Sequence, residues 1–378
     1  MLSNNTEKNE IAPVSIPINL NDYQKLARAK LPKMVYDYFA GAAEDEFTHQ
    51  RNQSEYQDWL LNYRVLTGVA QRNPGVNLLG KHYSYPFAVA PMAFHQLAHP
   101  AGECGVAQAA AKMRIPFTVS TMSNASLEEI AMSSTGDKWF QLYVFKDRGL
   151  TKSIVQRAEA AGYQMFQVTV DVPVLGRRER DMRNAFTLPE GLTIKNFEDN
   201  STASHFVGEH GKVGQAVYTL CHFDAGLNWK DIEWLCQLTS LPVLVKGIIN
   251  AEDAFLALNH GAAGVVVSNH GGRQLDSVPS TIEVLPEICD RLAGQGAVLI
   301  DGGIRRGTDI IKALALGADF VQIGRPMLWG LALEGKSGVE KVMQILIDEL
   351  DTAMALMGIE RIDQLNRSMI VSRRGRGK

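Results

Sequence analysis

The sequence is poor in the features that mark disulfide-rich, membrane-spanning and nucleic-acid-binding proteins. Only four of its 378 residues are cysteine, and they are widely spaced, with no Cys-x-x-Cys pair and no histidine at a metal-ligand interval. No stretch reaches the roughly 18 consecutive apolar residues of a membrane helix. With 38 Lys and Arg against 41 Asp and Glu, the chain lacks the basic excess that suits a phosphate backbone. We therefore expect reduced thiols, no metal site, and neither a membrane nor a nucleic acid as partner.

Targeting signals are also missing at both ends of the chain. Residues 1–11 are polar and lack the apolar middle of a secretory signal, and the basic ending from Ser372 to Lys378 is not a peroxisomal Ser-Lys-Leu signal. We expect a cytoplasmic protein with a disordered or extended tail at residues 1–20, a single domain at residues 21–370 and a basic tail at residues 371–378.

Short apolar runs alternate with amphipathic stretches from Pro86 onward, which is typical of βα units around a parallel sheet. An open, doubly wound sheet usually carries a Gly-rich dinucleotide turn after its first strand, and Ala90 to Phe94 lacks one. Eight such runs therefore favour an α/β fold of the closed (β/α)8 TIM-barrel type. The expected strands are Phe87 to Ala93, Phe117 to Thr121, Phe140 to Phe145, Met165 to Asp171, Val243 to Gly247, Gly264 to Asn269, Val298 to Gly303 and Phe320 to Arg325.

Two segments interrupt this regular pattern. The residues before Pro86, which include a helical pattern from Leu20 to Ala40, precede the first expected strand, and we expect them to close one end of the barrel. The fourth connection, between Asp171 and Val243, is far longer than the others, and such a length predicts a lid over the site, mobile between Glu179 and Gly214.

Polar residues end nearly every expected strand, where barrel enzymes assemble their sites. The last two units offer Gly302, Gly303 and Arg305, then Gly324 and Arg325, which supply open backbone N–H groups and guanidinium donors near helix starts. This pattern predicts a site for a cofactor with one phosphate group. The alternative is that these glycines only make tight turns.

Two further strand ends predict acid–base chemistry beside a cation. Lys246 ends an apolar run and is either a Schiff-base lysine, as in a barrel aldolase, or a fixed cation that faces an anion formed in turnover. His270 is a candidate base because Arg273, three positions on, could bind a carboxylate beside it. Asp171 is a candidate partner that would stabilise the protonated imidazole of His270.

The sequence resembles the FMN-dependent 2-hydroxy-acid oxidase and dehydrogenase family from about Asn21 to Ile370. The most specific match is Ser268-Asn269-His270-Gly271-Gly272-Arg273-Gln274-Leu275-Asp276, which fits the family's active-site signature. Supporting matches are Leu31 to Tyr38, Phe140 to Tyr143, Thr169 to Asp171, Leu175 to Glu179 and Asp301 to Asp309.

The resemblance implies a role for each matching residue. It makes His270 the catalytic base with Asp171 as its partner, and it places the substrate carboxylate between Arg178 and Arg273, with Tyr38 and Tyr143 completing the pocket. It implies FMN as the cofactor and a homotetramer. We expect O2 to be the electron acceptor, because the sequence shows no haem domain and no membrane-anchoring insertion in the fourth connection. The implied FMN-binding residues are Pro91, Met92, Ala93, Ser120, Gln141, Thr169, Lys246, Ser268, Asp301, Gly302, Gly303, Arg305, Gly324 and Arg325.

Met92 and Met122 depart from family members that resemble plant glycolate oxidase, which have a threonine and a tryptophan there. Two flexible thioethers would leave an adaptable apolar slot beside the substrate's α-carbon, with room for a methyl group. We therefore predict oxidation of L-lactate to pyruvate, with O2 reduced to H2O2. Glycolate is the alternative substrate. Two alternatives belong to other functional classes: an aldolase that uses Lys246, and a non-catalytic FMN-binding protein.

Overall fold

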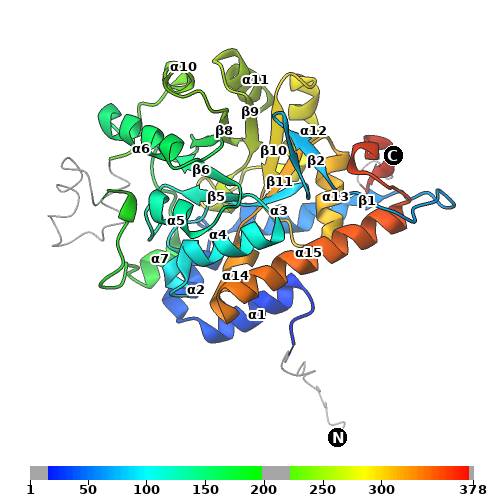
Figure 1. Cartoon of the computed structure of the whole chain (residues 1–378), viewed down its shortest axis with the longest axis horizontal. Helices are drawn as coiled ribbons and strands as arrows, with labels where there is room; N and C mark the ends of the chain where they lie inside the picture. The colour runs from blue at the N-terminus through cyan, green and yellow to red at the C-terminus, as the bar shows by residue number, and fades with distance from the viewer. Residues whose placement is uncertain (1–15, 198–221, 374–378) are drawn as a thin grey trace, which may run out of the picture.

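A computed structural model describes residues 16–197 and 222–373, and within them eight parallel strands form a closed barrel (Figure 1). The strands follow one another around the barrel in chain order, and the last pairs with the first. Their bounds are β4 Phe87–Val89, β5 Phe117–Ser120, β6 Lys138–Leu142, β7 Phe166–Thr169, β8 Val243–Ile248, β9 Gly264–Val267, β10 Ala297–Asp301 and β11 Phe320–Ile323. The predicted (β/α)8 barrel and its eight strands are confirmed.

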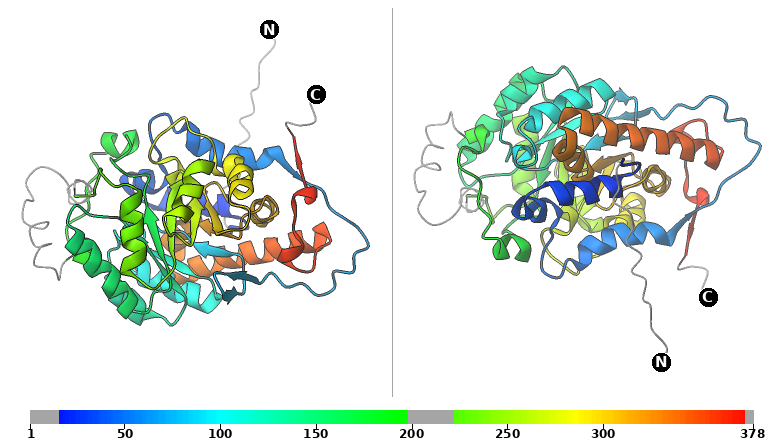
Figure 2. Two further views of the ribbon diagram at one scale, coloured as in Figure 1. Left: turned by 90° about the horizontal axis from the view of Figure 1, so that it is seen from above. Right: turned by 90° about the horizontal axis from the view of Figure 1, so that it is seen from below.

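Helices surround the barrel. They are α4 Gly102–Met113, α5 Leu127–Ser133, α6 Arg148–Ala160, α7 Glu179–Arg183, α10 Trp229–Leu238, α11 Ala251–Asn259, α12 Thr281–Leu292, α13 Gly307–Ala315, α14 Arg325–Glu334 and α15 Lys336–Met357. The long α15 packs on α4, α13 and α14 and covers one side of the molecule (Figure 2). Among the described residues, no helix is both long and apolar enough to cross a membrane.

The inside of the barrel changes from apolar to polar along the strand direction. At the amino ends, Trp139, Leu244 and Phe320 belong to one buried apolar cluster. Because side chains alternate along a strand, the interior position two residues further on in β6 is Gln141, and in β8 it is Lys246. The barrel therefore has a packed apolar base, and its polar interior side chains lie at the carboxyl ends of the strands.

The N-terminal segment differs from the expected single helical pattern. Helix α1 (Leu20–Lys30) ends before Pro32 and α2 (Lys33–Ala40) begins after it, because proline lacks an N–H and disfavours a helical residue before it. The amino end of the barrel is closed by the hairpin of β2 (Val76–Leu78) and β3 (Lys81–Tyr83), whose Leu78 and Tyr83 pack into the apolar base. Within the residues before Pro86 it is thus this hairpin that closes the amino end, whereas α2 lies beside the site at the carboxyl end.

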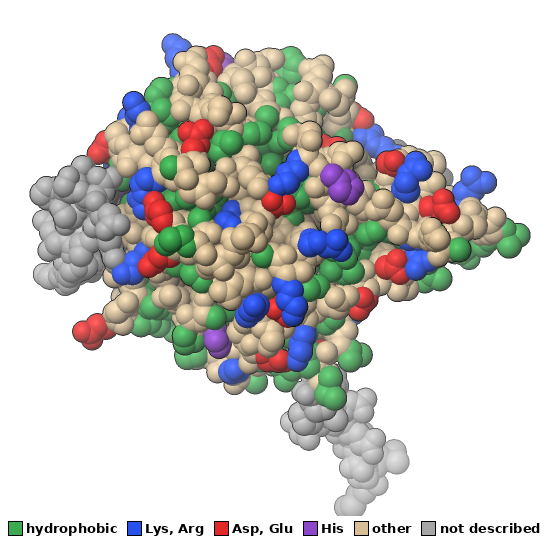
Figure 3. All heavy atoms as spheres, viewed as in Figure 1, with side chains coloured by type: hydrophobic (Ala, Val, Ile, Leu, Met, Phe, Trp, Pro, Cys, Tyr) green, Lys and Arg blue, Asp and Glu red, His purple; other side chains and the backbone are tan. Residues whose placement is uncertain are grey.

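Two peripheral features complete the fold. Strand β12 (Ile370–Ser372) pairs with β1 (Trp59–Leu61), so the first two residues of the predicted basic tail are part of a sheet. The loop between β1 and β2 projects away from the barrel, and its apolar side chains gather at the tip of the projection (Figure 3). Tyr63, Val65 and Leu66 are largely exposed there.

Candidate active site

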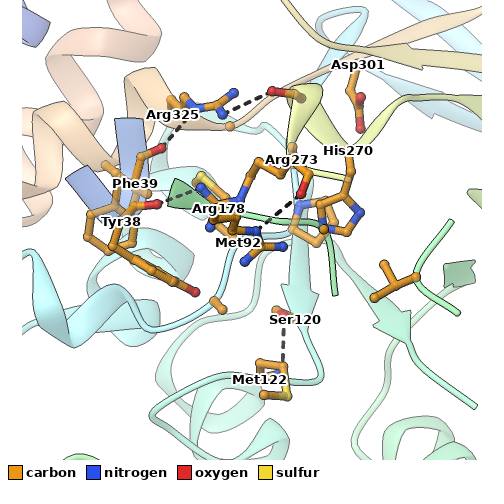
Figure 4. Close-up of a pocket in the computed structure, with 18 of the residues that line it drawn as sticks. Tyr38, Phe39, Met92, Ser120, Met122, Arg178, His270, Arg273, Asp301 and Arg325 are labelled. Atoms are coloured by element: carbon orange, nitrogen blue, oxygen red, sulfur yellow. Dashed lines mark hydrogen bonds between the residues drawn. The ribbon is translucent and has the colours of Figure 1, made fainter. Parts of the chain in front are cut away.

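A cavity of about 630 Å³ lies at the carboxyl ends of the barrel strands and contains nearly all the predicted site residues (Figure 4). Two predicted residues do not line it, and each is one hydrogen bond away: Ser268 accepts from Lys246 and Asp171 bonds to His270. The predicted residues that line the cavity are Tyr38, Pro91, Met92, Ala93, Ser120, Met122, Gln141, Tyr143, Thr169, Arg178, Lys246, His270, Arg273, Asp301, Gly302, Gly303, Arg305, Gly324 and Arg325.

His270 and Asp171 form a hydrogen-bonded pair, with 2.9 Å between Nδ1 and Oδ1. Burial lowers the pKa of His270, although the charge of Asp171 partly opposes that effect. Burial alone would raise the pKa of Asp171, but the charges of His270 and Lys246 outweigh it and the pKa is lowered. At neutral pH the imidazole is therefore uncharged beside a carboxylate, with Nδ1 as donor to Asp171 and Nε2 free to accept a proton.

The backbone at His270 has an uncommon left-handed conformation, with φ of 57°. The side chain of Ser268 supports it, because the Oγ accepts from the N–H of His270 at 3.1 Å. The same Oγ also accepts from Lys246 at 3.0 Å. The strand end thus orients the candidate base and the lysine together.

Arg178 and Arg273 converge beside His270, as Figure 4 shows. Arg273 donates to the carbonyls of Tyr38 and Gly41 and lies 5.1 Å from the ring centre of Tyr38. Burial, followed by the positive charge of Arg273, lowers the pKa of Arg178 to about 10, so it stays charged at neutral pH. Among the described residues, neither guanidinium group forms an ion pair with a carboxylate, and two such neighbouring groups form a site for an anion.

Tyr38 and Tyr143 complete this part of the cavity, and burial raises the pKa of both hydroxyls. Both groups are therefore protonated at neutral pH and can donate a hydrogen bond to a carboxylate or a hydroxyl oxygen.

Lys246 is buried and forms an ion pair with Asp301, with 2.9 Å between Nζ and Oδ2. This pairing favours the fixed-cation interpretation over the Schiff-base one, because an imine-forming lysine must be uncharged. On the strands that precede β8 around the barrel, Gln141 donates to Thr169 at 2.9 Å and accepts from Ser120 at 3.2 Å. These three predicted FMN-binding residues are thus joined by hydrogen bonds to one another.

Arg305 and Arg325 add two further cations to the cavity, and Arg325 lies beside the candidate base because it donates to the carbonyls of Phe39, Gly41 and Gly271. Burial lowers the pKa of Arg305 to about 10, and burial together with the charges of Arg273 and Arg305 holds the pKa of Arg325 well below its ordinary value. Gly302 and Gly303 have positive φ, and a Cβ on Gly303 would lie 1.7 Å from the carbonyl oxygen of Asn52. These glycines are therefore required for the turn and for packing against α3 (Phe47–Ser54), and their turn also leaves the backbone open toward the cavity.

The charge of the whole cavity is strongly unbalanced, which indicates an anionic ligand. Several basic side chains line it, and the only acidic ones among the described lining residues are Asp181 and Asp301. The basic ones are Arg177, Arg178, Lys246, Arg273, Arg305 and Arg325.

Apart from Arg178 and Tyr38, sequence reasoning missed the lining residues that come from the fourth connection and from α2. Asp181, Met182 and Phe186 lie in or just after α7, and Phe39 follows Tyr38 in α2. Leu175 and Arg177 belong to a motif that supports the family resemblance, and that motif is the one signal that could have indicated this segment. Of the predicted lid, residues 198–214 lie outside the described residues.

Comparison with known proteins identifies the family. The sequence model of the family described as FMN-dependent dehydrogenase matches residues 27–372. The chain belongs to this family. Glycolate oxidase 3 of Arabidopsis thaliana is 46% identical over 352 residues, which cover 93% of this chain and 95% of the relative. Glycolate oxidase of Spinacia oleracea is also 46% identical, over 354 residues, with 94% and 95% covered.

Solved structures of this FMN-dependent dehydrogenase family have the same fold. Mandelate oxidase in complex with (S)-2-phenylpropionate superposes with a TM-score of 0.85 at 39% identity, covering 94% of this chain and 98% of that one. A soluble mutant of the membrane-associated (S)-mandelate dehydrogenase from Pseudomonas putida superposes with a TM-score of 0.87 at 41% identity. The match covers 94% of this chain and 100% of that one. The family and these relatives establish FMN as the cofactor and 2-hydroxy acids as the substrate class.

The cavity fits FMN. Asp301 Oδ1 and Arg305 Nε are buried and have no hydrogen-bond partner among the described residues, although both side chains line the cavity. A carboxylate oxygen can accept from a ligand hydroxyl and a guanidinium N–H can donate to a phosphate, which are the two polar groups that FMN carries beyond its ring. The roles of the individual residues remain predictions.

Proposed function

We propose that the protein oxidises a small aliphatic L-2-hydroxy acid to the 2-keto acid and passes the electrons to O2. The observation that carries this proposal is the hydrogen-bonded pair of His270 and Asp171 beside Arg178 and Arg273 in one cavity. O2 is the proposed acceptor because both glycolate oxidases and mandelate oxidase, as their names state, are oxidases.

Each residue's part in the reaction follows from its atoms. Arg178 and Arg273 bind the substrate carboxylate, while Tyr38 and Tyr143 donate to its oxygens, so that the α-carbon is held in one orientation. His270 Nε2 then removes the hydroxyl proton, and Asp171 stabilises the imidazolium that results. When bound, FMN accepts the two electrons and the α-hydrogen that the substrate carbon gives up. Lys246 supplies a fixed positive charge beside the cofactor.

The comparisons favour glycolate, the alternative substrate, over the L-lactate expected from the sequence, because the curated relatives quoted above are glycolate oxidases. L-lactate stays a second candidate on one observation: Met92 and Met122 both line the cavity. One buried methyl group contributes about 1–3 kcal/mol of discrimination, or roughly 10- to 200-fold. The expected difference in reaction rate between the two acids is thus large enough to measure directly.

The deciding experiment is anaerobic mixing of the purified protein with glycolate, L-lactate or (S)-mandelate, followed by the admission of air. Loss of the flavin's blue absorption band, with recovery and peroxide formation in air, is the expected result for at least one small acid. D-lactate is the control for the L configuration. No bleaching by any of the acids would refute the proposed reaction, and bleaching without recovery in air would refute O2 as the acceptor.

A cytoplasmic location and a homotetramer stay predictions. The projecting loop with Tyr63, Val65 and Leu66 gives the homotetramer a structural basis, because exposed apolar side chains grouped on one surface favour contact with another chain.

A further inference from the structure

Each of the two tyrosines in the carboxylate pocket is stacked on a phenylalanine that comes from the fourth connection. The rings of Tyr38 and Phe186 lie 4.3 Å apart at an interplanar angle of 8°. The rings of Tyr143 and Phe223 lie 4.2 Å apart at 23°. Phe186 precedes the undescribed residues 198–221 and Phe223 follows them, so the two stacks come from the two described ends of one connection.

Backbone pairing fixes Phe223 beside Tyr143. Phe223 forms an antiparallel β-bridge with Phe145, just after β6. The N–H of Asp224 donates to the carbonyl of Val144 at 3.0 Å, so the end of the connection runs along the extension of that strand. Its position is reinforced by Arg148, which forms ion pairs of 2.6 Å with both Asp224 and Asp231.

Polar contacts fix Phe186 beside Tyr38 in a comparable way. Phe186 directly follows the turn that ends α7, and its N–H donates to the carbonyl of Asp181 at 2.9 Å. Asn184 of the same turn donates to Asp37 in α2 at 2.8 Å, and Asp37 also pairs with Arg180 at 3.7 Å. Because Tyr38 is the next residue after Asp37, the contacts that hold α7 on α2 also hold Phe186 over Tyr38.

We infer that Phe186 and Phe223 are positioning residues that hold the hydroxyls of Tyr38 and Tyr143 toward the substrate carboxylate. The inference deepens the proposed function and rests on it. A tyrosine ring turns about two side-chain bonds, and a parallel ring at about 4 Å restricts that rotation without a hydrogen bond that would occupy the hydroxyl. Both ends of the fourth connection therefore set the affinity for the carboxylate, although neither phenylalanine needs to touch it.

The test is a double-mutant cycle between Phe223→Leu and Tyr143→Phe. Phe223→Leu removes the stacked ring and keeps an apolar side chain, and we expect KM to rise about 2- to 12-fold, the equivalent of one aromatic pair, with a smaller change in kcat. In the Tyr143→Phe background, where no hydroxyl remains to be positioned, Phe223→Leu is expected to raise KM no further. Additive effects of the two substitutions on KM would overturn the inference. For the cycle of Phe186→Leu with Tyr38→Phe we expect the same pattern: a rise in KM for Phe186→Leu alone and no further rise in the Tyr38→Phe background.

Two variants separate positioning from general packing. Phe223→Tyr keeps a ring in the stack and is expected to keep KM close to the wild-type value, without most of the rise that Phe223→Leu causes. Phe140→Leu removes a buried ring that contacts Tyr163, outside the cavity, and is expected to lower the melting temperature without raising KM. A rise in KM for Phe140→Leu equal to that for Phe223→Leu would contradict a positioning role.

Binding of oxalate, followed by the change in flavin absorbance, tests the inference without turnover, because oxalate carries the carboxylate but has no α-hydrogen to lose. We expect Phe223→Leu to weaken oxalate binding by the same factor by which it raises KM. If no hydroxy acid bleaches the wild-type flavin, the proposed function fails, and the oxalate titration still decides the inference. Equal oxalate affinity in Phe223→Leu and wild type would overturn it.

Discussion

Replacing Asp171 by asparagine tests the proposed base most directly. Asparagine preserves the shape of the side chain that lies 2.9 Å from His270 Nδ1, but it removes the negative charge. That charge stabilises the imidazolium formed when Nε2 takes the substrate proton. A hydrogen bond to a charged group contributes about 1.5–3 kcal/mol, so the rate of flavin bleaching should fall about 10- to 150-fold.

The pH dependence of the same rate gives a second readout with a definite sign. His270 must be uncharged to accept the proton, so the rate falls as the pH decreases through its pKa. Burial already lowers that pKa below the ordinary histidine value, and the Asp171 carboxylate opposes the shift. Removing the carboxylate lowers the pKa further. The acid limb of Asp171→Asn should therefore move to lower pH even though the plateau rate drops.

Stopped-flow measurement of anaerobic flavin bleaching between about pH 4 and pH 9 is the assay, a range that brackets the ordinary histidine pKa. Asp181→Asn is the matched control, because Asp181 lines the same cavity but, in the described part of the chain, forms neither a hydrogen bond nor an ion pair with His270. We expect its acid limb to stay at the wild-type position. If Asp171→Asn keeps its rate within about threefold, or if its acid limb moves to higher pH, the reasoning about the His270–Asp171 pair is refuted.

Three further predictions follow from other parts of the molecule. Met122→Trp fills the apolar slot of the cavity and should lower kcat/KM for L-lactate relative to glycolate by about 10-fold or more, measured by competing the two acids; an unchanged ratio would show that Met122 does not shape the choice. Lys246→Met leaves Asp301 buried without its ion-pair partner and should lower the free energy of unfolding by about 3–5 kcal/mol. A lower melting temperature and a lower FMN content of the purified protein are the expected results. Leu66→Glu places a charge on the projecting apolar loop and should lower the mass of the oligomer measured by light scattering. An unchanged mass would show that this loop is not part of the subunit interface.

The barrel and the polar ends of its strands could be predicted because both depend on short-range patterns. Alternation along a strand places Lys246 two residues after Leu244 on the barrel interior, and the parallel arrangement brings all carboxyl ends to one face. Residues such as Asp301 and His270 could thus be assigned to a common site although they lie far apart in the sequence.

The parts contributed by irregular segments could not be predicted in the same way. Phe186 and Phe223 lie outside the helices of the fourth connection, and their partners are fixed by tertiary contacts such as the bridge between Phe145 and Phe223. The hairpin that closes the barrel was missed because β2 and β3 have three residues each, too few to show an alternating pattern. The helical pattern of Leu20 to Ala40 was recognised, but no sequence rule says at which end of a barrel such a segment docks.

The division of the barrel interior into an apolar base and a polar top explains how the fold can hold so many buried polar groups. Burying Lys246 and Asp301 is costly, and their mutual ion pair offsets only part of that cost. Leu78 and Tyr83 of the hairpin cover the apolar base. The apolar surface buried there stabilises the fold independently of the site. Substitutions that neutralise both Lys246 and Asp301 should therefore be better tolerated in folding than the loss of either charge alone, whereas FMN binding should suffer in all three variants.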